Sequence, residues 1–326
     1  MKIIDRVYGP INIDEPVLVE LIKSKPLQRL KNINQAGASK YAIAGKTVSR
    51  FEHSLGVMIL LKILGASLEE QIAGLLHDVP HTAFSHVIDF VFPSKEYKHE
   101  FHEKFHKQLV KNSEVPSILA KYNYDLDRIL DEHNFSLLER DLPDLCADRI
   151  DYALRDRVAM NYDIGHIADY IKNFVVKDNE IIFKDKVIAY YFAQDYLEMD
   201  YRAWSHPKEI ALFKVLANAI KIALDNTIIS QEDLFSDDDF VYNKLKNSNH
   251  KDILHYLDKL NYQFAIKEDS KNYDFFARNK LRFVDPKFID IDNKLSKVST
   301  AFPKFKAELT KHKDWVETGH FIKIVN

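Results

Sequence analysis

The chain has 326 residues, of which 46% are hydrophobic and 29% are charged, and this composition excludes disordered and collagen-like chains. Its 46 basic and 49 acidic residues give a net charge of −3, without the basic excess expected of a protein that grips long nucleic acid. Cys146 is the only cysteine, so no intrachain disulfide can form and a reducing compartment is expected. We expect this cysteine to be a small buried residue.

The N-terminal sequence has no long apolar core of the kind found in secretory signals. Nor does the sequence contain an apolar run of about 18 residues, the length needed for a membrane-spanning helix. We therefore expect a cytoplasmic protein that does not insert into membranes.

The first elements along the chain are predicted to be helices. Residues 15–31 form an amphipathic pattern interrupted near Pro26. Residues 53–64 are apolar on nearly every side, which predicts a central buried helix.

A capping box of Ser67 and Glu70 is expected to open the next helix. This helix must end near Val79, because Pro80 disfavours helical geometry in the residue before it. Thr82 is then predicted to cap a further helix that continues to Pro93.

The second half of the chain mixes helices and strands. Two amphipathic helices are predicted over residues 95–111 and 143–160, and a β-hairpin over residues 174–192, where apolar residues alternate around a Lys-Asp-Asn-Glu turn. Residues 194–225 return to a helical pattern. The last hundred residues are expected to combine a cap at residues 230–233, short helices and strands such as residues 280–284.

These patterns predict a mainly α protein with a β-hairpin and a smaller α+β C-terminal region. We place the domain boundary near residue 226, which gives one domain over residues 1–225 and a second region over residues 226–326.

A metal site is suggested by the segment LLHDVPHTAFSH, residues 75–86, which ends an apolar run. His53 opens a buried helix, where an imidazole needs a partner. Together with His77, Asp78 and Asp148 it can converge from three helices into a set of two nitrogen and two oxygen ligands. Such a set fits a first-row transition metal with open positions, whereas Ca²⁺ prefers oxygen ligands alone.

Four blocks in this order, SRFEHSLGV, LLHDVPHTAFSH, KHE and ADRIDYALRD, resemble the HD-domain metal-dependent phosphohydrolases, especially the dNTP triphosphohydrolase branch. The likeness lies between residues 29 and 156 and weakens toward residue 210. It implies a helical HD-domain bundle, a nucleotide substrate and a homo-oligomer. It also implies that His53, His77, Asp78 and Asp148 hold Fe²⁺, Mn²⁺, Co²⁺ or Ni²⁺, with Mg²⁺ on the substrate phosphates.

The resemblance also implies roles for residues around the metal. Those that line the reacting phosphate match His81, His86, Asp89 and His99. Those that contact the sugar or the phosphates match Gln35, Arg50, Arg149, Tyr152 and Asp156. The spacing agrees in part, because His86 and Asp89 are neighbours at i,i+3 on the predicted helix, where the carboxylate can orient a general acid.

The favoured reaction is hydrolysis of a (deoxy)nucleoside triphosphate to nucleoside and triphosphate. The enzymatic alternative is a phosphatase or phosphodiesterase that acts on nucleoside monophosphates or cyclic nucleotides, and the non-catalytic alternative is a nucleotide sensor. Ala36 stands where deoxy-selective members often carry a larger apolar residue, and Trp204 where a tyrosine often sits. Selectivity for deoxyribose therefore stays open at this point.

A rival metal motif is His102-Glu103-Lys104-Phe105-His106, which spells the HExxH pattern of zinc peptidases. Its surroundings are highly charged and no third ligand follows, so we favour a structural interpretation. Asp151 and Arg155 are expected to form an ordinary surface pair at i,i+4. The acidic run at residues 237–239 is expected to be a solvated loop or a helix start.

Overall fold

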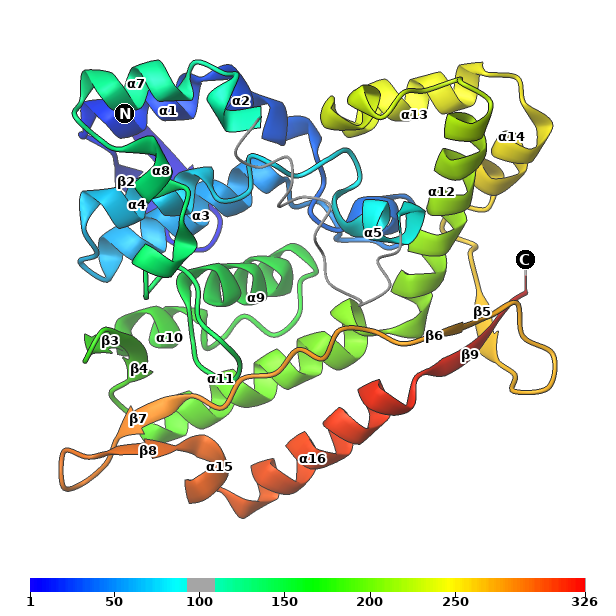
Figure 1. The fold of residues 1–326 in the computed structure, drawn as a ribbon. Coiled ribbons are helices and arrows are strands. Elements are labelled where there is room, and N and C mark those ends of the chain that lie inside the picture. Colours follow the sequence, from blue (N-terminus) through cyan, green and yellow to red (C-terminus); the bar gives the residue numbers. More distant parts are fainter. Residues whose placement is uncertain (93–108, 326) are drawn as a thin grey trace.

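Helices dominate the computed structural model of this chain, which describes residues 1–92 and 109–325 (Figure 1). The expectation of a mainly α protein with small β regions is therefore confirmed. Within those two ranges, no helix is both long enough and apolar enough to cross a bilayer.

The elements that precede the β-hairpin are mostly short helices. They are β1 Lys2–Asp5, β2 Gly9–Asn12, α1 Pro16–Lys23, α2 Lys25–Arg29, η1 Leu30–Asn32, η2 Gly37–Tyr41, α3 Arg50–Ile63, α4 Leu68–Leu76, η3 Ser85–Val87, α5 Ile88–Val91, α7 Val115–Lys121, α8 Leu126–Ile129, η4 Glu132–Asn134, α9 Ala147–Ala159 and α10 Ile167–Asn173.

The remaining elements include the longest helices. They are β3 Phe174–Lys177, β4 Glu180–Phe183, α11 Lys186–Met199, the π-helical turn η5 Asp200–Trp204, α12 Pro207–Asp225, η6 Glu232–Phe235, α13 Asp238–Asn247, α14 Lys251–Asp258, β5 Ile266–Glu268, β6 Phe275–Ala277, β7 Lys287–Ile289, β8 Leu295–Lys297, α15 Val298–Ala301, α16 Pro303–Thr318 and β9 His320–Ile324.

The strands form three small sheets. β1 pairs with β2, a second sheet has the order β3-β4-β7-β8, and a third has the order β5-β9-β6. Pairing is antiparallel except between β4 and β7, where Phe183 lies opposite Phe288 in a parallel arrangement. The second sheet therefore joins the predicted hairpin to strands from the last 40 or so residues of the chain.

Local signals explain where the central helices begin and end. The buried helix α3 starts at Arg50, three residues before the predicted start, because Ser49 and Glu52 form a capping box. Ser67 caps α4 as expected, with its hydroxyl accepting from the Glu70 amide. The Glu70 carboxylate does not close that box; it accepts from the amides of Leu137 and Leu138 instead.

The segment after α4 differs from the prediction. Thr82 caps no helix, and its buried hydroxyl has no hydrogen-bond partner among the described residues. Phe84 has a φ of 60°, so the chain turns in the left-handed region before η3 begins at Ser85. Most of the helix predicted over residues 95–111 lies outside the described residues.

The hairpin is confirmed but shorter than predicted. Its strands β3 and β4 end at Phe183, and Asp185 then caps α11 by accepting from the amides of Val187 and Ile188. The apolar residues that follow therefore belong to a helix. The strand expected over residues 280–284 is absent from the described structure, because this segment links β6 to β7 in an extended form without ladder pairing.

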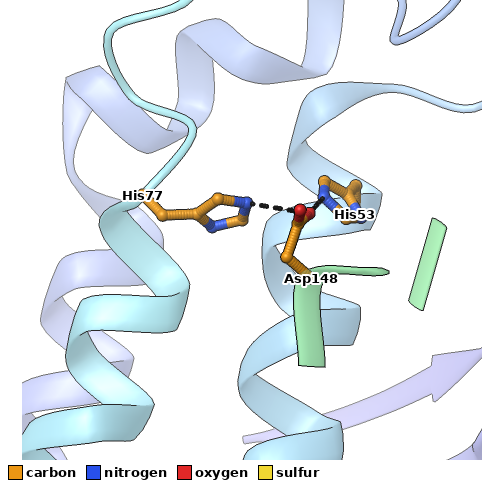
Figure 2. A group of neighbouring side chains, drawn as sticks. All are labelled: His53, His77 and Asp148. Atoms are coloured by element: carbon orange, nitrogen blue, oxygen red, sulfur yellow. Dashed lines mark hydrogen bonds and ion pairs between the residues drawn. The ribbon is translucent and has the colours of Figure 1, made fainter. Parts of the chain in front are cut away.

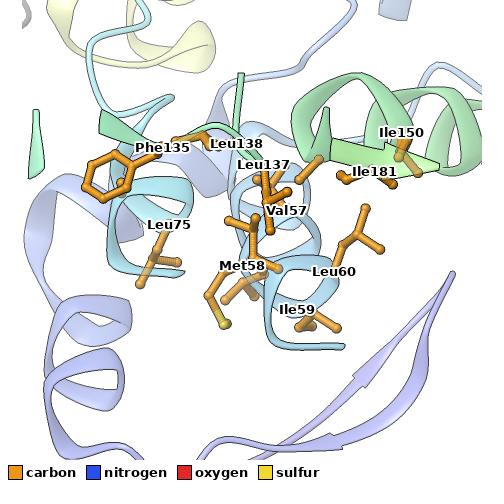
Figure 3. Packing of buried hydrophobic residues seen from close by; sticks show 14 of the residues in the cluster. Val57, Met58, Ile59, Leu60, Leu75, Phe135, Leu137, Leu138, Ile150 and Ile181 are labelled. Atoms are coloured by element: carbon orange, nitrogen blue, oxygen red, sulfur yellow. The ribbon is translucent and has the colours of Figure 1, made fainter. Parts of the chain in front are cut away.

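Two hydrophobic clusters form the core. In the first, α3 is central, and Figure 3 shows Val57, Met58 and Leu60 of this helix surrounded by side chains that include Leu75 and Ile150. The second is built around α12 with α5, α13 and α14. Residues of α15 and α16 belong to the first cluster, together with the N-terminal helices. The boundary near residue 226 stays a prediction.

Candidate metal centre and active site

Three side chains from three helices bring metal-type donor atoms together (Figure 2). They are His53 on α3, His77 at the C-terminal end of α4 and Asp148 in the first turn of α9. Asp148 Oδ1 lies 2.8 Å from His53 Nε2 and 3.6 Å from His77 Nε2. One donor atom from each residue lies within 4.8 Å of the other two.

The chain fixes each of these side chains by a local feature. The capping box at Ser49 sets the start of α3 and thereby places His53 one turn into the helix. His77 follows the last residue of α4, and its Nδ1 bonds the carbonyl oxygen of Gly74 at 2.7 Å. That bond leaves Nε2 facing Asp148. The expected stop before Pro80 therefore delivers His77 to the rim of the buried helix.

Asp78 lies beside this group. Its Oδ1 is 3.5 Å from His77 Nε2, and its Oδ2 is 4.0 Å from His53 Nε2. Both oxygens also accept from Arg50 Nη1, at 3.0 and 2.9 Å. The structure thus brings all four predicted ligands together, with Asp78 shared between the histidines and an arginine.

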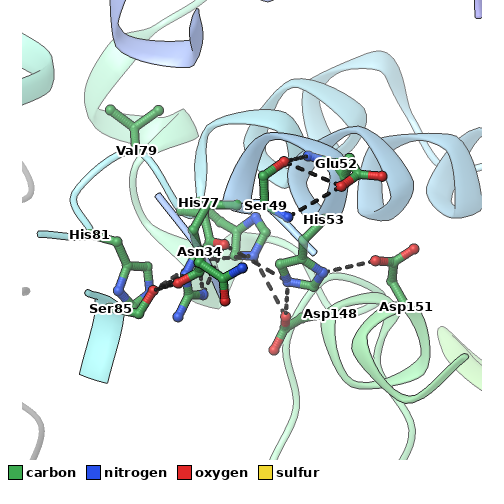
Figure 4. A network of polar contacts seen from close by, with 12 residues as sticks. Asn34, Ser49, Glu52, His53, His77, Val79, His81, Ser85, Asp148 and Asp151 are labelled. Carbon is green, nitrogen blue, oxygen red and sulfur yellow. Dashed lines mark hydrogen bonds and ion pairs between the residues drawn. The ribbon is translucent and has the colours of Figure 1, made fainter. Parts of the chain in front are cut away.

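Asp151 contacts one of the predicted ligands, although the sequence pattern did not assign it to the site. Its Oδ2 lies 2.8 Å from His53 Nδ1 (Figure 4). The same oxygen accepts from Arg155 Nε at 2.9 Å. Both side chains are fully buried, and Arg155 also pairs with Asp5 at 3.0 Å. The prediction of a surface pair is therefore wrong. Because Asp151 follows Asp148 by three residues on α9, the helical spacing was the signal that could have found it.

The carboxylates make the site favour positive charge. Burial lowers the pKa of His77, but Asp78 and Asp148 outweigh this effect and raise that pKa to about 10. Burial likewise lowers the pKa of His53, while its bonds to Asp148 and Asp151 raise it above the ordinary value. Burial raises the pKa of Asp78, yet Arg50 and His77 hold it well below its usual range.

The donor set fits a divalent transition metal. The buried Nε2 of His77 has no hydrogen-bond partner in residues 1–92 or 109–325, although carboxylate oxygens lie just beyond bonding distance. A buried imidazole nitrogen without a partner, next to a carboxylate that is itself a quarter exposed, can accommodate a cation reached from solvent. Asp151 would then orient His53 through its other ring nitrogen.

The residues predicted to line the phosphate lie next to this group. His81 Nε2 is 3.1 Å from Asp78 Oδ1, and the rings of His81 and His86 meet edge to face with centroids 5.2 Å apart. His86 Nδ1 lies 3.3 Å from Asp89 Oδ2, which agrees with the predicted pairing. His99 lies outside the described residues, as does the HExxH segment.

Arg50 reaches toward the same side. Its Nε donates to Ser85 Oγ at 3.0 Å, while its buried Nη2 has no hydrogen-bond partner within the described part of the chain. An unpaired guanidinium nitrogen beside the donor group is suited to a phosphoryl oxygen.

A second group of side chains, the aromatic wall of Tyr152, Asp156 and Trp204, lies toward the C-terminal end of α9. The indole Nε1 of Trp204 donates to Asp156 Oδ2 at 2.8 Å, and the ring stands perpendicular to Tyr152 at 4.9 Å between centroids. Tyr152 is hydrogen-bonded to the hydroxyl of Tyr196.

The other predicted substrate contacts are Arg149 and Gln35. Arg149 is bound by groups of the chain itself, the carbonyl oxygens of Asp144 and Arg140 and the Glu139 carboxylate. The buried Oε1 of Gln35 has no partner within the described ranges.

The remaining expectations concern residues outside this group. The acidic run at residues 237–239 begins α13, with Asp237 as its cap, so the helix-start interpretation is confirmed. Asp238 is fully buried and accepts from the amides of Asn34 and Phe84. Cys146 is buried, as expected.

Comparisons of the chain with known proteins identify its relatives. The HD domain family matches residues 50–156. The uncharacterized protein YdhJ of Bacillus subtilis is 39% identical over 100% of this chain and 99% of its own length. The metal-dependent phosphohydrolase cns2 of Cordyceps militaris is 31% identical over 86% of this chain and 83% of its own length.

Two further matches are more limited. The deoxynucleoside triphosphate triphosphohydrolase SAMHD1 of Xenopus laevis is 39% identical, but over 29% of this chain and 18% of its own length. The crystal structure of a phosphohydrolase from Bacteroides thetaiotaomicron has a TM-score of 0.66, covers 92% of this chain and 94% of its own, and is 20% identical, which supports the fold alone. With a matching domain, a relative aligned over most of both lengths and a metal-type donor group at its centre, the chain belongs to the HD-domain metal-dependent phosphohydrolases.

Proposed function

We propose that this phosphohydrolase converts (deoxy)nucleoside triphosphates to nucleoside and triphosphate. The observation that carries the proposal is the placement of two groups on one helix: Asp148 of the buried donor group beside Arg50 and, eight residues later on α9, Asp156 of the aromatic wall. The donor group suits a phosphate and the aromatic wall suits a nucleoside. A partial similarity to SAMHD1, over 29% of this chain, supports a nucleoside triphosphate as the substrate.

His53, His77, Asp148 and Asp78 would hold the metal, and Fe²⁺, Mn²⁺, Co²⁺ and Ni²⁺ all accept these ligands. Such a metal supplies Lewis-acid chemistry and lowers the pKa of bound water. Within the chain, Asp151 keeps the His53 ring oriented, and the Gly74 carbonyl does the same for His77.

Other residues act on the phosphates. The Nη2 atom of Arg50 binds phosphoryl oxygens as negative charge spreads over them. His81 acts on the same oxygens, and both Arg50 and His81 contact the Asp78 carboxylate. His86, oriented by Asp89, donates a proton to the leaving oxygen. Mg²⁺ on the substrate phosphates would complete the charge balance. His99 is assigned to the same group by family resemblance.

On the nucleoside side, Asp156 and Tyr152 bind sugar hydroxyls, and Gln35 contributes a further polar contact. Arg149, like Arg50, offsets charge on the phosphoryl oxygens. We propose in addition that the protein acts as a homo-oligomer in the cytoplasm, with its HD domain in residues 1–225 and a smaller region in residues 226–326.

Product analysis tests the reaction. The purified protein is incubated with Mn²⁺ and panels of NTPs, dNTPs, NMPs and cyclic nucleotides, and the products are separated by ion exchange. Nucleoside together with intact triphosphate supports the proposal. Orthophosphate from a monophosphate, or opening of a cyclic nucleotide, moves the protein to the phosphatase or phosphodiesterase alternative.

A His77→Ala variant provides the matched control, because it removes a proposed ligand at the end of α4. We expect it to stay folded, to bind less Mn²⁺ and to lose turnover by several orders of magnitude. Full activity in this variant would exclude the site. Tight nucleotide binding without metal-dependent turnover in the unaltered protein would favour the sensor alternative.

A further inference from the structure

The π-helical turn η5 ends at Trp204, which belongs to the aromatic wall proposed to bind the nucleoside. A π-helical turn is rare and is found most often at functional sites. Here it follows α11 directly and ends at Trp204, whose indole bonds Asp156 and packs against Tyr152 and Tyr196. The conformation of this turn therefore sets the nucleoside wall.

A residue of α16 holds the start of the turn. Asp200 is fully buried, and its Oδ2 lies 2.7 Å from Nε2 of His312, which is itself 6% exposed. Its other oxygen accepts from Ser205 Oγ at 2.7 Å. The carboxylate thus joins both ends of the turn to a helix more than 100 residues further along the chain.

A second residue of the C-terminal region holds the end of the turn. Asn279 Nδ2 donates to the carbonyl oxygen of Trp204 at 2.7 Å. Asn279 belongs to the extended segment between β6 and β7, which lies between α11 and α16 in Figure 1. The carbonyl is that of the residue whose indole bonds Asp156.

We infer that His312 and Asn279 are positioning residues for the nucleoside, which fix Trp204 against Asp156 through the π-helical turn. The inference rests on the proposed function, since it assigns the Trp204 wall to the nucleoside. The metal-type donors come from α3, α4 and α9 instead. Loosening the turn should therefore weaken nucleoside binding and leave the metal and the phosphate chemistry in place.

Kinetics of three variants tests the inference. Asn279→Ala removes one hydrogen bond and should raise KM for the preferred nucleotide about fivefold, with kcat within twofold of the unaltered protein. His312→Ala should raise KM further, but it leaves a buried carboxylate without this partner and risks the fold. His312→Gln keeps an amide donor and should restore KM toward the original value. Bound Mn²⁺ should be equal in all three.

A spectroscopic measurement gives a readout besides turnover. The chain has two tryptophans, Trp204 and Trp315, so labelling with 5-fluorotryptophan gives two ¹⁹F signals, which Trp315→Phe assigns. We expect the Trp204 signal to shift in Asn279→Ala and in His312→Ala. The control is His320→Gln, which alters another buried histidine of the C-terminal region, paired with the exposed carboxylate of Glu268, and should leave KM and the Trp204 signal unchanged.

The outcomes separate this inference from the proposed function. An unchanged Trp204 signal and unchanged KM in Asn279→Ala would overturn the inference while nucleotide turnover stands. A fall in both bound Mn²⁺ and kcat in Asn279→Ala would also overturn the inference, because the residue would then support the whole fold. If the unaltered protein turns over no nucleotide, the proposed function fails. In that case, nucleotide affinity is measured instead of KM, by titrating nucleotide while the ¹⁹F signal of Trp204 is recorded. The absence of any binding refutes both the proposed function and the inference.

Discussion

Asp151 shows how one side chain can decide the chemistry of another. It accepts from His53 on one side and from Arg155 on the other, in a position closed to solvent. A carboxylate on Nδ1 keeps the proton on that nitrogen, which leaves Nε2 with the lone pair that a metal needs. Arg155 in turn balances the charge of Asp151, since burial raises the pKa of this carboxylate but Arg155 and His53 lower it below the ordinary value.

Replacing Asp151 with asparagine should weaken metal binding about 10- to 100-fold, because an amide no longer fixes the His53 tautomer. Calorimetric titration with Mn²⁺ measures this directly. Asp89→Asn is the comparison, since Asp89 contacts His86 rather than a proposed ligand. Equal Mn²⁺ affinity in Asp151→Asn and the unaltered protein would contradict this role.

Metal affinity should rise with pH. The carboxylates bring the pKa of His77 to about 10, so a proton occupies His77 at neutral pH and the metal must displace it. They also raise the pKa of His53, so His53 holds a proton more readily than a free imidazole does. Raising the pH toward 10 removes this competition, and lowering the pH restores it. We expect uptake of Mn²⁺ to release up to about two protons at pH 7.

Calorimetry in buffers of different ionisation enthalpy counts these protons. His77→Ala should release about one proton fewer. An affinity that does not change between pH 6 and 9 would show that the histidines are not the displaced groups.

At the residue scale, the sequence indicated the proposed metal ligands but not the side chains that hold them in place. His53, His77, Asp78 and Asp148 each stood out because a polar ligand type interrupts an apolar helix. Asp151 and Arg155 satisfy each other, and their i,i+4 spacing alone does not distinguish them from a solvent-exposed pair, although the i,i+3 spacing of Asp151 from Asp148 does point to the site. Only the packing of α9 against α3 buries them.

Among the elements, the contact between α3 and α9 depends on a glycine. A Cβ on Gly56 would lie 1.9 Å from Arg155 Nη2 and 2.1 Å from Asp151 Oδ1. Such distances are far below van der Waals contact, so the two helices can approach closely only with glycine at this position.

Gly56→Ala should therefore destabilise the protein and reduce metal affinity together. In an ordinary helix the same change stabilises by up to about 1 kcal/mol. Here the new methyl group must push Asp151 away from His53. Thermal unfolding and Mn²⁺ titration measure the two effects.

Gly74→Ala is the matched control in the adjacent helix α4, because the main-chain carbonyl oxygen that bonds His77 Nδ1 is kept in this variant. Its Cβ would meet Leu61 Cδ1 at 2.5 Å, which is the end of a flexible apolar side chain. We expect some loss of stability and retained metal affinity. If both variants lost metal affinity equally, close packing in general, rather than the ion pair, would be responsible.

The helices and the hairpin were predictable where a local signal defines them, as with Ser67 before α4, Pro80 after it and the turn between β3 and β4. The prediction was wrong where tertiary contacts decide. Thr82 is a good capping residue, but the chain turns at Phe84 instead. Residues 280–284 have strand-forming side chains, yet no neighbouring strand pairs with them in the described structure.

For the whole molecule, a bound metal would cross-link parts of the chain that are far apart in sequence. The proposed ligands lie on α3, α4 and α9, and about 95 residues separate the first ligand from the last. Metal bound only by the folded state adds about 2.7 kcal/mol at a free concentration 100 times the dissociation constant.

Removing metal with a chelator should thus lower Tm, and added Mn²⁺ should restore it in a concentration-dependent way. Differential scanning calorimetry follows the change. In His77→Ala the response to Mn²⁺ should nearly disappear, while its metal-free Tm stays close to that of the unaltered protein. A full response in this variant would indicate that the stabilising metal binds elsewhere.

The arrangement of the C-terminal region could not be predicted from the sequence. Pairing of β7 with β4, and the bond of His312 to Asp200, join residues more than 100 positions apart, and no local pattern encodes such contacts. Composition and periodicity indicated only a mixture of short helices and strands.

The length of helix α9 sets the separation between two groups of side chains. Asp148 at its beginning belongs to the metal-type donor group, and Asp156, eight residues later, belongs to the nucleoside wall. At about 1.5 Å per residue, the helix separates these two ends by about 12 Å. Because each residue also turns the helix by about 100°, one residue inserted between Asp148 and Tyr152 would rotate the nucleoside wall out of line with the donor group. With the proposed function, the length of substrate that spans the two groups is therefore tied to whole turns of one helix, and a longer or shorter span requires a change of three or four residues.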